Sequence, residues 1–225
     1  MDLSRQRREY ETVGMEPSDL DPDPFAQFVR WMEDAQASGT AEPTAVVLST
    51  ADVRGRPSAR AVLLKDISGG GFVVFTNYDS RKGREVAVNP WAALTFVWLE
   101  LSRQVRVEGH VEHLEPAESD AYFATRPRGS QIGAWASPQS HPIADRAELD
   151  RYVAEATARF DGVDPIPRPP NWGGLRVVPV AIELWQGRGS RLHDRLVYVP
   201  ADGEPAPEPG SEVRVGRWRI ERRAP

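Results

Sequence analysis

The stretch TAVVLSTADVRGRPSARAVLLKDISGGGFVVFTN, residues 44–77, decides the fold class. It contains three short runs of apolar and β-branched residues, which are typical of strands. The runs are separated by RGRP at 54–57 and SGGG at 68–71, two segments typical of turns. Connections this short join neighbouring strands in opposite directions, so the stretch predicts an antiparallel meander.

The rest of the chain alternates between further strands and short helices. Strands are expected at 91–100, 103–114, 174–187, 190–198 and 213–224, and helices at 24–38, 80–89, 116–125 and 146–160. Asp145 and Glu148 have the spacing of a capping box for the last of these helices. Six to eight strands without a strand–helix–strand rhythm predict a mainly β protein, an antiparallel barrel with helices packed outside it. We expect residues 1–24 to form a mobile N-terminal arm and residues 25–225 a single domain.

Composition excludes several classes of function. The chain has no cysteine, and its four histidines lack metal-binding spacing, so we expect no metal site. The net charge of −5 argues against general nucleic-acid binding. Neither a P-loop nor a GxGxxG motif is present, and no GxSxG motif supports serine hydrolysis. Without a signal peptide or a long apolar run, we expect a cytoplasmic protein with no membrane partner.

Cationic residues cluster at two places that suit a local anion site. Arg81 and Lys82 fall in the first turn of the helix that Asp79 or Ser80 caps, where free N–H groups favour phosphate, although a solvated helix start is the alternative. The second place is Arg60 and Lys65, the latter being the only lysine besides Lys82. Their odd separation points them to opposite faces of an unbroken strand. One ligand therefore contacts both only at a strand end, a bulge or a subunit boundary.

Two further stretches combine arginine with aromatic or histidine side chains. YFATRPRGSQIGAWASPQS, residues 122–140, is expected to be a loop that either binds a ligand or packs across the core. SRLHDRLVY, residues 190–198, is expected to be a strand, which would place Arg191, His193 and Arg195 on one face. That face is either a solvated surface or a site for an anion.

Five blocks of the sequence, taken together, resemble the pyridoxamine 5'-phosphate oxidase family. They are RAVLLKD (60–66), FTNYDSRKGRE (75–85), RQVRVEG (103–109), YFATRPRGSQIGAWASPQS (122–140) and IELWQGRGSRLHDRLVY (182–198). The resemblance runs in the family's order from Arg7 to the C-terminus. It implies an FMN-binding split β-barrel that works as a homodimer with the flavin at the interface. The implied reaction oxidises pyridoxine 5'-phosphate or pyridoxamine 5'-phosphate to pyridoxal 5'-phosphate, with O2 as acceptor and H2O2, plus ammonia from the amine, as products.

The resemblance also assigns residues to the flavin and to the substrate. The residues it assigns to FMN are Arg60, Ala61, Val62, Leu63, Leu64, Lys65, Phe75, Thr76, Arg81, Lys82, Gln104, Gln139, Ser140, Trp185 and Arg195. Those it assigns to the substrate are Arg7, Arg8, Glu9, Tyr10, Lys65, Tyr122, Arg126, Ser130, Arg191, Leu192 and His193. Within these sets, Arg81 and Lys82 hold the flavin phosphate, and Tyr122, Arg126 and Ser130 clamp the substrate phosphate. Arg191 and His193 are the implied catalytic pair, and residues 7–10 the segment that closes over the pyridine ring.

The sequence departs from the family's pattern at a few positions. Phe75 stands where tyrosine is more common, the chain ends in RRAP rather than RLAP, and the loop ADGEPAPEPGSE, residues 201–212, is longer than expected. These departures lie away from the substrate clamp and concern dimer packing more than chemistry. Two alternatives stay open beside the oxidase. One is a related flavin oxidase of phenazine or other secondary metabolism, and the other is a non-catalytic protein that binds FMN or pyridoxal 5'-phosphate.

Overall fold

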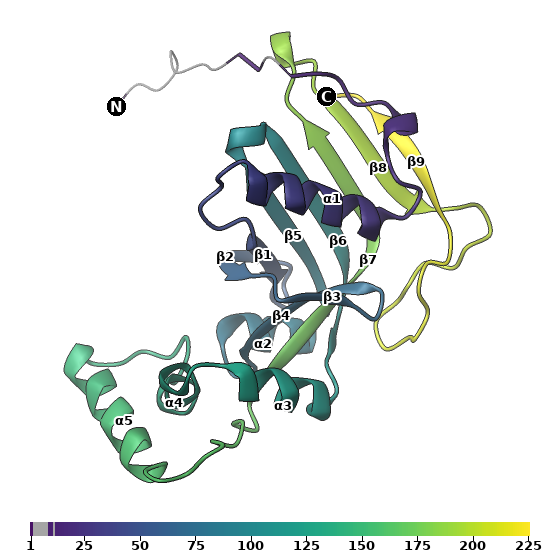
Figure 1. The fold of residues 1–225 in the computed structure, drawn as a ribbon. Helices are drawn as coiled ribbons and strands as arrows, with labels where there is room; N and C mark the ends of the chain where they lie inside the picture. Colours follow the sequence, from purple (N-terminus) through teal and green to yellow (C-terminus); the bar gives the residue numbers. More distant parts are fainter. Residues whose placement is uncertain (2–8, 11) are drawn as a thin grey trace.

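The protein is built around one antiparallel sheet of strongly curved strands (Figure 1). The computed structural model describes residue 1, residues 9–10 and residues 12–225. Its described strands are β1 (Ala45–Ala51), β2 (Pro57–Leu63), β3 (Asp66–Ser68), β4 (Gly71–Asn77), β5 (Trp91–Trp98), β6 (Arg103–His113), β7 (Trp172–Gln186), β8 (Asp194–Pro200) and β9 (Trp218–Arg223). The predicted meander and the second hairpin are confirmed. The described residues form nine strands rather than six to eight, partly because the second run of the meander breaks at Leu64–Lys65 into β2 and β3.

The long strand β7 determines how the sheet curls. The strand order is β2-β1-β5-β6-β7-β4-β3, with β8 added to β7 and β9 added to β8. One end of β7, residues 172–177, pairs with β4, and the other, residues 182–186, pairs with β8, while β6 follows β7 along both halves. Between these halves the register of β6 and β7 shifts at Glu108 and Gly109, where β7 contains one extra residue, Val180. A Cβ on Gly109 would lie 2.0 Å from the carbonyl oxygen of Val178, so glycine permits this close approach.

Helix α1 covers one face of the sheet. The described helices are α1 (Pro24–Ala37), α2 (Arg81–Val88), α3 (Pro116–Thr125), α4 (Arg128–Ala136) and α5 (Arg146–Arg159), with 3-10 turns η1 (Pro17–Asp19), η2 (Leu99–Leu101) and η3 (Gly189–Arg191). Asp23 caps α1 by accepting from the N–H of Phe25. The fully buried Phe28 packs edge-on against Phe72 of β4 and Phe96 of β5. This aromatic packing fixes α1 on the main core.

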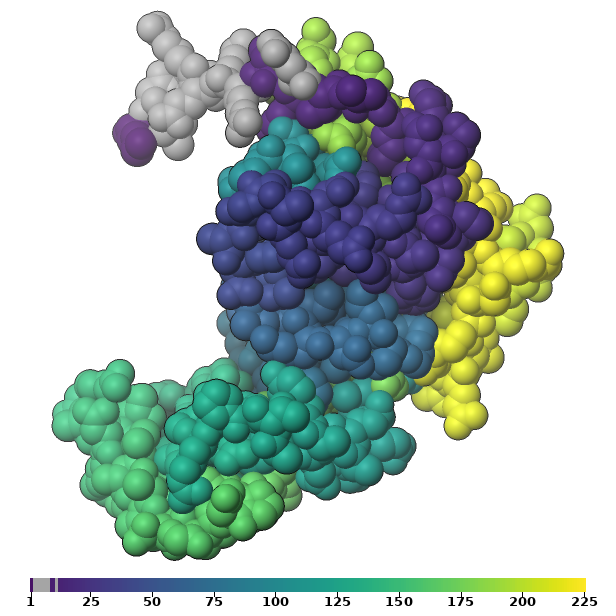
Figure 2. All heavy atoms as spheres, viewed as in Figure 1, coloured from purple at the N-terminus to yellow at the C-terminus, as the bar shows by residue number. Residues whose placement is uncertain are grey.

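Helices α3, α4 and α5 form a second lobe that projects from the sheet (Figure 2). Its small core contains Phe123, Ile132, Phe160 and Trp172. Within it, Asp145 accepts from the N–H of Glu148 as predicted, but the Glu148 carboxylate accepts from Ala144 rather than closing the capping box.

The prediction that residues 122–140 form a loop is wrong, because α3 and α4 occupy most of this stretch. The apolar side chains of Ile132 and Ala136 are one helical turn apart, and burying both in the small core favours a helix. Arg128 supports the arrangement by donating to the carbonyl oxygens of Phe160 and Val163.

The prediction of a strand at 190–198 is also wrong in its first half. Strand β8 begins only at Asp194, and Ser190 and Arg191 have φ values of 56° and 61°. The turn closes because Leu192 donates to Gly189 and Arg188 donates to the ring of His193. Arg191, His193 and Arg195 therefore do not share one strand face. The last strand is likewise shorter than predicted and begins at Trp218.

Part of the segment predicted to be a mobile arm packs on the domain. Met15 is buried in the main core, and its N–H donates to the Asp194 carboxylate at 3.0 Å. The hydroxyl of Tyr198 donates to the carbonyl oxygen of Asp21. The mobility of residues 1–24 stays a prediction. Among the described residues, none of the helices has the length and apolar character needed to span a membrane.

Candidate active site

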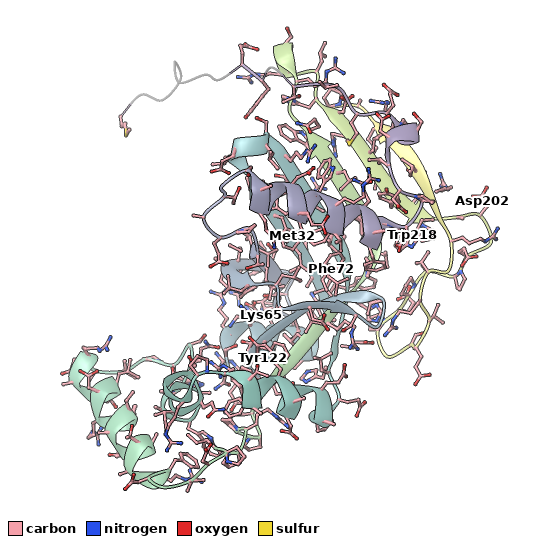
Figure 3. The ribbon with its side chains drawn as sticks, in the orientation of Figure 1. Met32, Lys65, Phe72, Tyr122, Asp202 and Trp218 are labelled. Atoms are coloured by element: carbon pink, nitrogen blue, oxygen red, sulfur yellow. The ribbon has the colours of Figure 1, made fainter. Side chains whose placement is uncertain are left out.

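A cavity of about 630 Å³ opens where β2, β4, α2 and α3 meet, at the junction between the sheet and the helical lobe. Figure 3 labels Lys65 and Tyr122, which lie at this junction on the sheet side and on the lobe side. The cavity gathers thirteen of the residues assigned from sequence: Arg60, Ala61, Val62, Leu63, Lys65, Phe75, Thr76, Arg81, Lys82, Tyr122, Arg126, Gln139 and Ser140. Its remaining lining residues are Ser58, Ala59, Asn77 and Trp172.

The first turn of α2 presents a buried cation to this cavity. Ser80 caps the helix as predicted, accepting from the N–H of Gly83. A Cβ on Gly83 would lie 2.0 Å from the carbonyl oxygen of Tyr78, so only glycine lets the turn fold back this tightly. The Lys82 ammonium donates to Thr76 at 2.9 Å and to Gln139 at 3.3 Å.

Lys82 is only 8% exposed, and none of the described carboxylates pairs with it. Burial, with a smaller contribution from the charge of Arg60, lowers the pKa of Lys82. A buried ammonium without a counter-ion is costly unless an anion joins it. This end of the cavity therefore suits a phosphate group.

A buried carboxylate, Glu85 on α2, ties this helix to the strands. It accepts hydrogen bonds from Ser58 and Thr50 and pairs with Arg81 at 2.9 Å and with Arg60 at 3.4 Å. Burial alone would raise the pKa of Glu85, but these hydrogen bonds and the charge of Arg81 outweigh it and lower the pKa to about 2. Glu85 thus holds the two guanidinium groups at the cavity wall in fixed positions.

Arg60 and Lys65 can line one cavity despite their odd separation because strand β2 ends between them. Arg60 lies in β2, but β2 stops at Leu63, so Lys65 no longer follows the alternation of that strand. The N–H of Lys65 donates to Val73 of β4, which turns the chain toward the neighbouring strand. Both side chains line the same cavity. Leu64, between them, is buried in the main core instead.

The opposite wall of the cavity is aromatic and carries an arginine. The rings of Phe75 and Tyr122 stack with centroids 3.8 Å apart, and Trp172 stacks on Phe75 at 5.4 Å. The guanidinium of Arg126 lies over the Trp172 ring, 4.5 Å from its centroid. Its Nη1 is buried without a hydrogen-bond partner among the described residues, and burial lowers the pKa of Arg126. A flat apolar wall beside an unpartnered guanidinium suits an aromatic ligand that carries an anionic group.

A second group of sequence-assigned residues lies elsewhere, where β7 ends and β8 begins. The rings of Tyr10, Trp185 and His193 contact one another, with centroids 4.6–5.9 Å apart. His193 accepts from the N–H of Arg188 through Nδ1 at 3.0 Å, so a neutral ring carries its proton on Nε2. Glu9 accepts from the N–H of Ser190 in the same place. We call residues 185–195 with Tyr10 the β7–β8 corner.

The remaining assigned residues complete the description of the corner. Leu192 is exposed, and Arg195 pairs with Glu183 at 2.7 Å. Gln104 and Trp185 line a smaller cavity of about 420 Å³ beside the corner. Ser130 is exposed in the first turn of α4 and does not line the main cavity. Arg7 and Arg8 lie outside the described residues.

Within one chain, the two groups lie near opposite ends of β7. Trp172 lines the main cavity, and Trp185 lies in the corner. At about 3.3 Å per residue, the strand between them is roughly 40 Å long. One copy of the chain therefore does not bring the assigned residues into a single site.

The family to which the chain belongs follows from comparison with known proteins. Residues 32–160 match the model of the pyridoxamine 5'-phosphate oxidase family, and residues 172–225 match that of the pyridoxine 5'-phosphate oxidase C-terminal dimerisation region. The chain belongs to the pyridoxamine 5'-phosphate oxidase family. It is 58% identical to the pyridoxine/pyridoxamine 5'-phosphate oxidase of Rubrobacter xylanophilus, over 88% of this chain and 91% of that protein. The oxidase of the same name from Burkholderia ambifaria is 51% identical over 99% of each chain. The predicted family and enzyme class, an oxidoreductase, are thus confirmed.

Solved structures agree on the architecture. The crystal structure of PhzG from Burkholderia lata, in complex with tetrahydrophenazine-1-carboxylic acid, superposes with a TM-score of 0.81 at 31% identity and covers 94% of this chain and 98% of that one. A pyridoxamine 5'-phosphate oxidase-related, FMN-binding protein from Nostoc punctiforme gives a TM-score of 0.65 at 17% identity and covers 92% and 100%. The predicted fold, an antiparallel split barrel with helices, is confirmed.

Sequence reasoning missed four residues that line the cavity, Ser58, Ala59, Asn77 and Trp172, and Glu85, which pairs with two arginines of its wall. Glu85 lies one helical turn after Arg81, a spacing that signals an ion pair on α2. Ser58 lies two positions before Arg60 on β2, on the same face. Asn77 and Trp172 are cross-strand partners in β4 and β7, and no local pattern reveals that pairing.

Proposed function

We propose that this enzyme oxidises pyridoxine 5'-phosphate and pyridoxamine 5'-phosphate to pyridoxal 5'-phosphate, with FMN as cofactor and O2 as electron acceptor. Oxidation of the alcohol yields H2O2, and oxidation of the amine also consumes water and releases ammonia. One observation carries the proposal: the cavity holds two cations, the buried Lys82 and the half-buried Arg126, without carboxylate partners among the described residues. The cofactor and the substrate each bring one phosphate, which matches these two positions.

The residues present fit FMN. Its phosphate would meet Lys82, Arg81 and the N-terminal turn of α2, where the buried ammonium requires an anion. Arg60 and the backbone of residues 61–63 in β2 would contact the ring system. When bound, FMN supplies the acceptor for the two electrons of the oxidation and passes them to O2.

The chain itself binds and orients the substrate. Arg126 would hold the substrate phosphate through the guanidinium N–H groups that line the cavity, and the stacked rings of Tyr122 and Phe75 would limit the tilt of the pyridine ring. His193 would donate from Nε2, because Nδ1 is already occupied by the N–H of Arg188. Arg191 would orient the substrate from the same corner.

We also propose that the site is completed across a homodimer. The cavity and the β7–β8 corner are too far apart along β7 to act on one ligand within one chain. The match of residues 172–225 to a dimerisation region supports a pairing in which the corner of one protomer closes the cavity of its partner. This arrangement would place FMN at the subunit interface.

The test is an anaerobic reduction of the FMN-loaded protein. We expect pyridoxine 5'-phosphate to bleach the flavin band with formation of one pyridoxal 5'-phosphate per flavin, and air to restore the band with formation of H2O2. The similarity to PhzG makes tetrahydrophenazine-1-carboxylic acid the rival compound to run in parallel. If only that compound bleaches the flavin, it is the better candidate substrate and the proposed one is wrong. If neither compound does, the protein binds FMN without catalysing this oxidation.

A further inference from the structure

Arg126 is held in place almost entirely by aromatic rings. It follows α3 and lies over Trp172 at 4.5 Å and over Phe123 at 5.5 Å. Among the described residues, no carboxylate lies within ion-pair distance of its guanidinium, and the buried Nη1 has no hydrogen-bond partner. A flexible side chain of this length needs something to fix its direction. In this cavity, the ring faces are the groups that do so.

Trp172 is itself firmly fixed. It is 6% exposed and begins β7, opposite Asn77 of β4. Its ring stacks on Phe75 at 5.4 Å and meets Phe123 edge-on at 5.1 Å. Its backbone N–H donates to Pro169, and its carbonyl oxygen accepts from Arg168 at 2.5 Å. The ring below the guanidinium is therefore a rigid platform that belongs to both the sheet and the lobe.

We infer that Trp172 is the positioning residue of Arg126: its ring face orients the guanidinium, whose Nη1 is buried, so that the remaining N–H donors stay available in the cavity for the phosphate of the substrate. This inference rests on the proposed function. Attraction between a cation and an indole face needs no hydrogen-bonding group, so it fixes the guanidinium without using its N–H donors. A carboxylate in the same place would neutralise Arg126 and compete with the phosphate.

The experiment compares two substrates that differ only in the phosphate. The ratio of kcat/KM for pyridoxine 5'-phosphate to that for pyridoxine measures discrimination for the phosphate. In the FMN-loaded enzyme, we expect Trp172→Leu to lower this ratio about tenfold, mainly through KM of the phosphorylated substrate. Trp172→Phe keeps a stacking ring and is expected to lower the ratio less, and it decides the question if the leucine variant does not fold.

The pair Trp135 and Arg159 provides a matched control. Arg159 lies over Trp135 at the same 4.5 Å, but neither residue lines the main cavity. Trp135→Leu should lower the free energy of unfolding and leave the discrimination ratio unchanged. In an Arg126→Ala background, Trp172→Phe should have no further effect on the ratio, because the group that it positions is gone.

Equal loss of kcat/KM for both substrates, or an unchanged ratio in Trp172→Leu, would overturn the inference and leave Trp172 a packing residue. If the leucine variant does not fold, an unchanged ratio in Trp172→Phe has the same meaning. Failure of the wild-type enzyme to oxidise pyridoxine 5'-phosphate would instead overturn the proposed function. In that case, the affinity of the FMN-loaded protein for pyridoxal 5'-phosphate, measured by calorimetry, still tests the positioning role. It should fall in Trp172→Phe and stay unchanged in Trp135→Leu.

Discussion

The main cavity leaves two of its cations without carboxylate partners in the described part of the chain, whereas the β7–β8 corner pairs most of its own. In the cavity, Lys82 and Arg126 are without carboxylate partners among the described residues. In the corner, Arg195 pairs with Glu183, and the buried Asp194 pairs with Arg188 at 3.3 Å and with Arg222 at 2.6 Å. The cavity therefore keeps positive charge for a ligand, whereas the charges of the corner are largely used to hold the fold.

The two regions therefore differ in how charge affects stability. In a preformed anion site, burying cations without partners lowers the stability of the unliganded protein, and binding of the anion offsets this loss. The corner offers His193, Arg191 and exposed Leu192 on a turn whose shape depends on internal ion pairs and hydrogen bonds. Substitution of the unpaired cations should mainly affect ligand affinity, and substitution of the residues in ion pairs should mainly affect stability.

The largest expected effect is on cofactor affinity. Lys82→Met should weaken FMN binding about 100-fold, because a charge-assisted contact to the phosphate is lost. It should not lower the free energy of unfolding of the apoprotein, since a buried unpaired cation is removed. Fluorescence titration of FMN and urea unfolding measure the two quantities.

Arg84→Gln is the control for this prediction. Arg84 is an exposed cation on the same helix and does not line the cavity. Its removal should change the FMN dissociation constant less than threefold, a change below about 0.7 kcal/mol. Equal weakening in the two variants would mean that general charge, rather than the buried ammonium, attracts the cofactor.

A second effect concerns acid stability of the cavity wall. Because its folded pKa is lowered to about 2, the Glu85 carboxylate stabilises the fold above its unfolded value near 4.5, and this contribution is lost as the pH falls toward 2. The full contribution is at most about 3 kcal/mol. Glu85→Gln should therefore flatten the pH dependence of the free energy of unfolding between pH 4.5 and 2.

Thr50→Val sharpens the same test. It removes one of the hydrogen bonds that lower the pKa of Glu85, so acid unfolding should begin at a higher pH than in the wild type. An unchanged acid transition in both variants would show that Glu85 does not carry this stability.

The smallest effect is expected in the corner. Asp194→Asn should lower the free energy of unfolding by about 2 kcal/mol, because Arg188 and Arg222 lose a buried partner. In the same variant, the affinity of the apoprotein for FMN should stay close to that of the wild type. A variant with unchanged stability and weakened FMN binding would reverse the comparison between the two regions.

Much of the fold could be predicted from local patterns. The meander, the second hairpin, helix Pro116–Thr125 and the Ser80 cap all have strong short-range signals, and the structure contains each of them. The loop predicted at 122–140 and the strand predicted at 190–198 are wrong in large part, because tertiary contacts override local preference there. Ile132 and Ala136 lie on one face of α4 and are buried in the core of the helical lobe, and Arg191 adopts positive φ in a closed turn.

The candidate site could be predicted only in part for a related reason. Arg60, Arg81 and Lys82 form local cationic patterns that indicate an anion site. Trp172 reaches the cavity through the pairing of β7 with β4, about 95 residues apart in the chain, so no local window contains its partners. The division between cavity and corner likewise depends on the length of β7.

The most direct test of the composite site is subunit complementation between Arg126→Ala in the cavity and His193→Ala in the corner. Each homodimer should have little activity toward pyridoxine 5'-phosphate. If the cavity of one protomer is completed by the corner of its partner, an isolated heterodimer has one site with both substitutions and one with neither, and it should regain about half of wild-type turnover. If it stays as inactive as the two homodimers, the residues act within one protomer, and the composite site is contradicted.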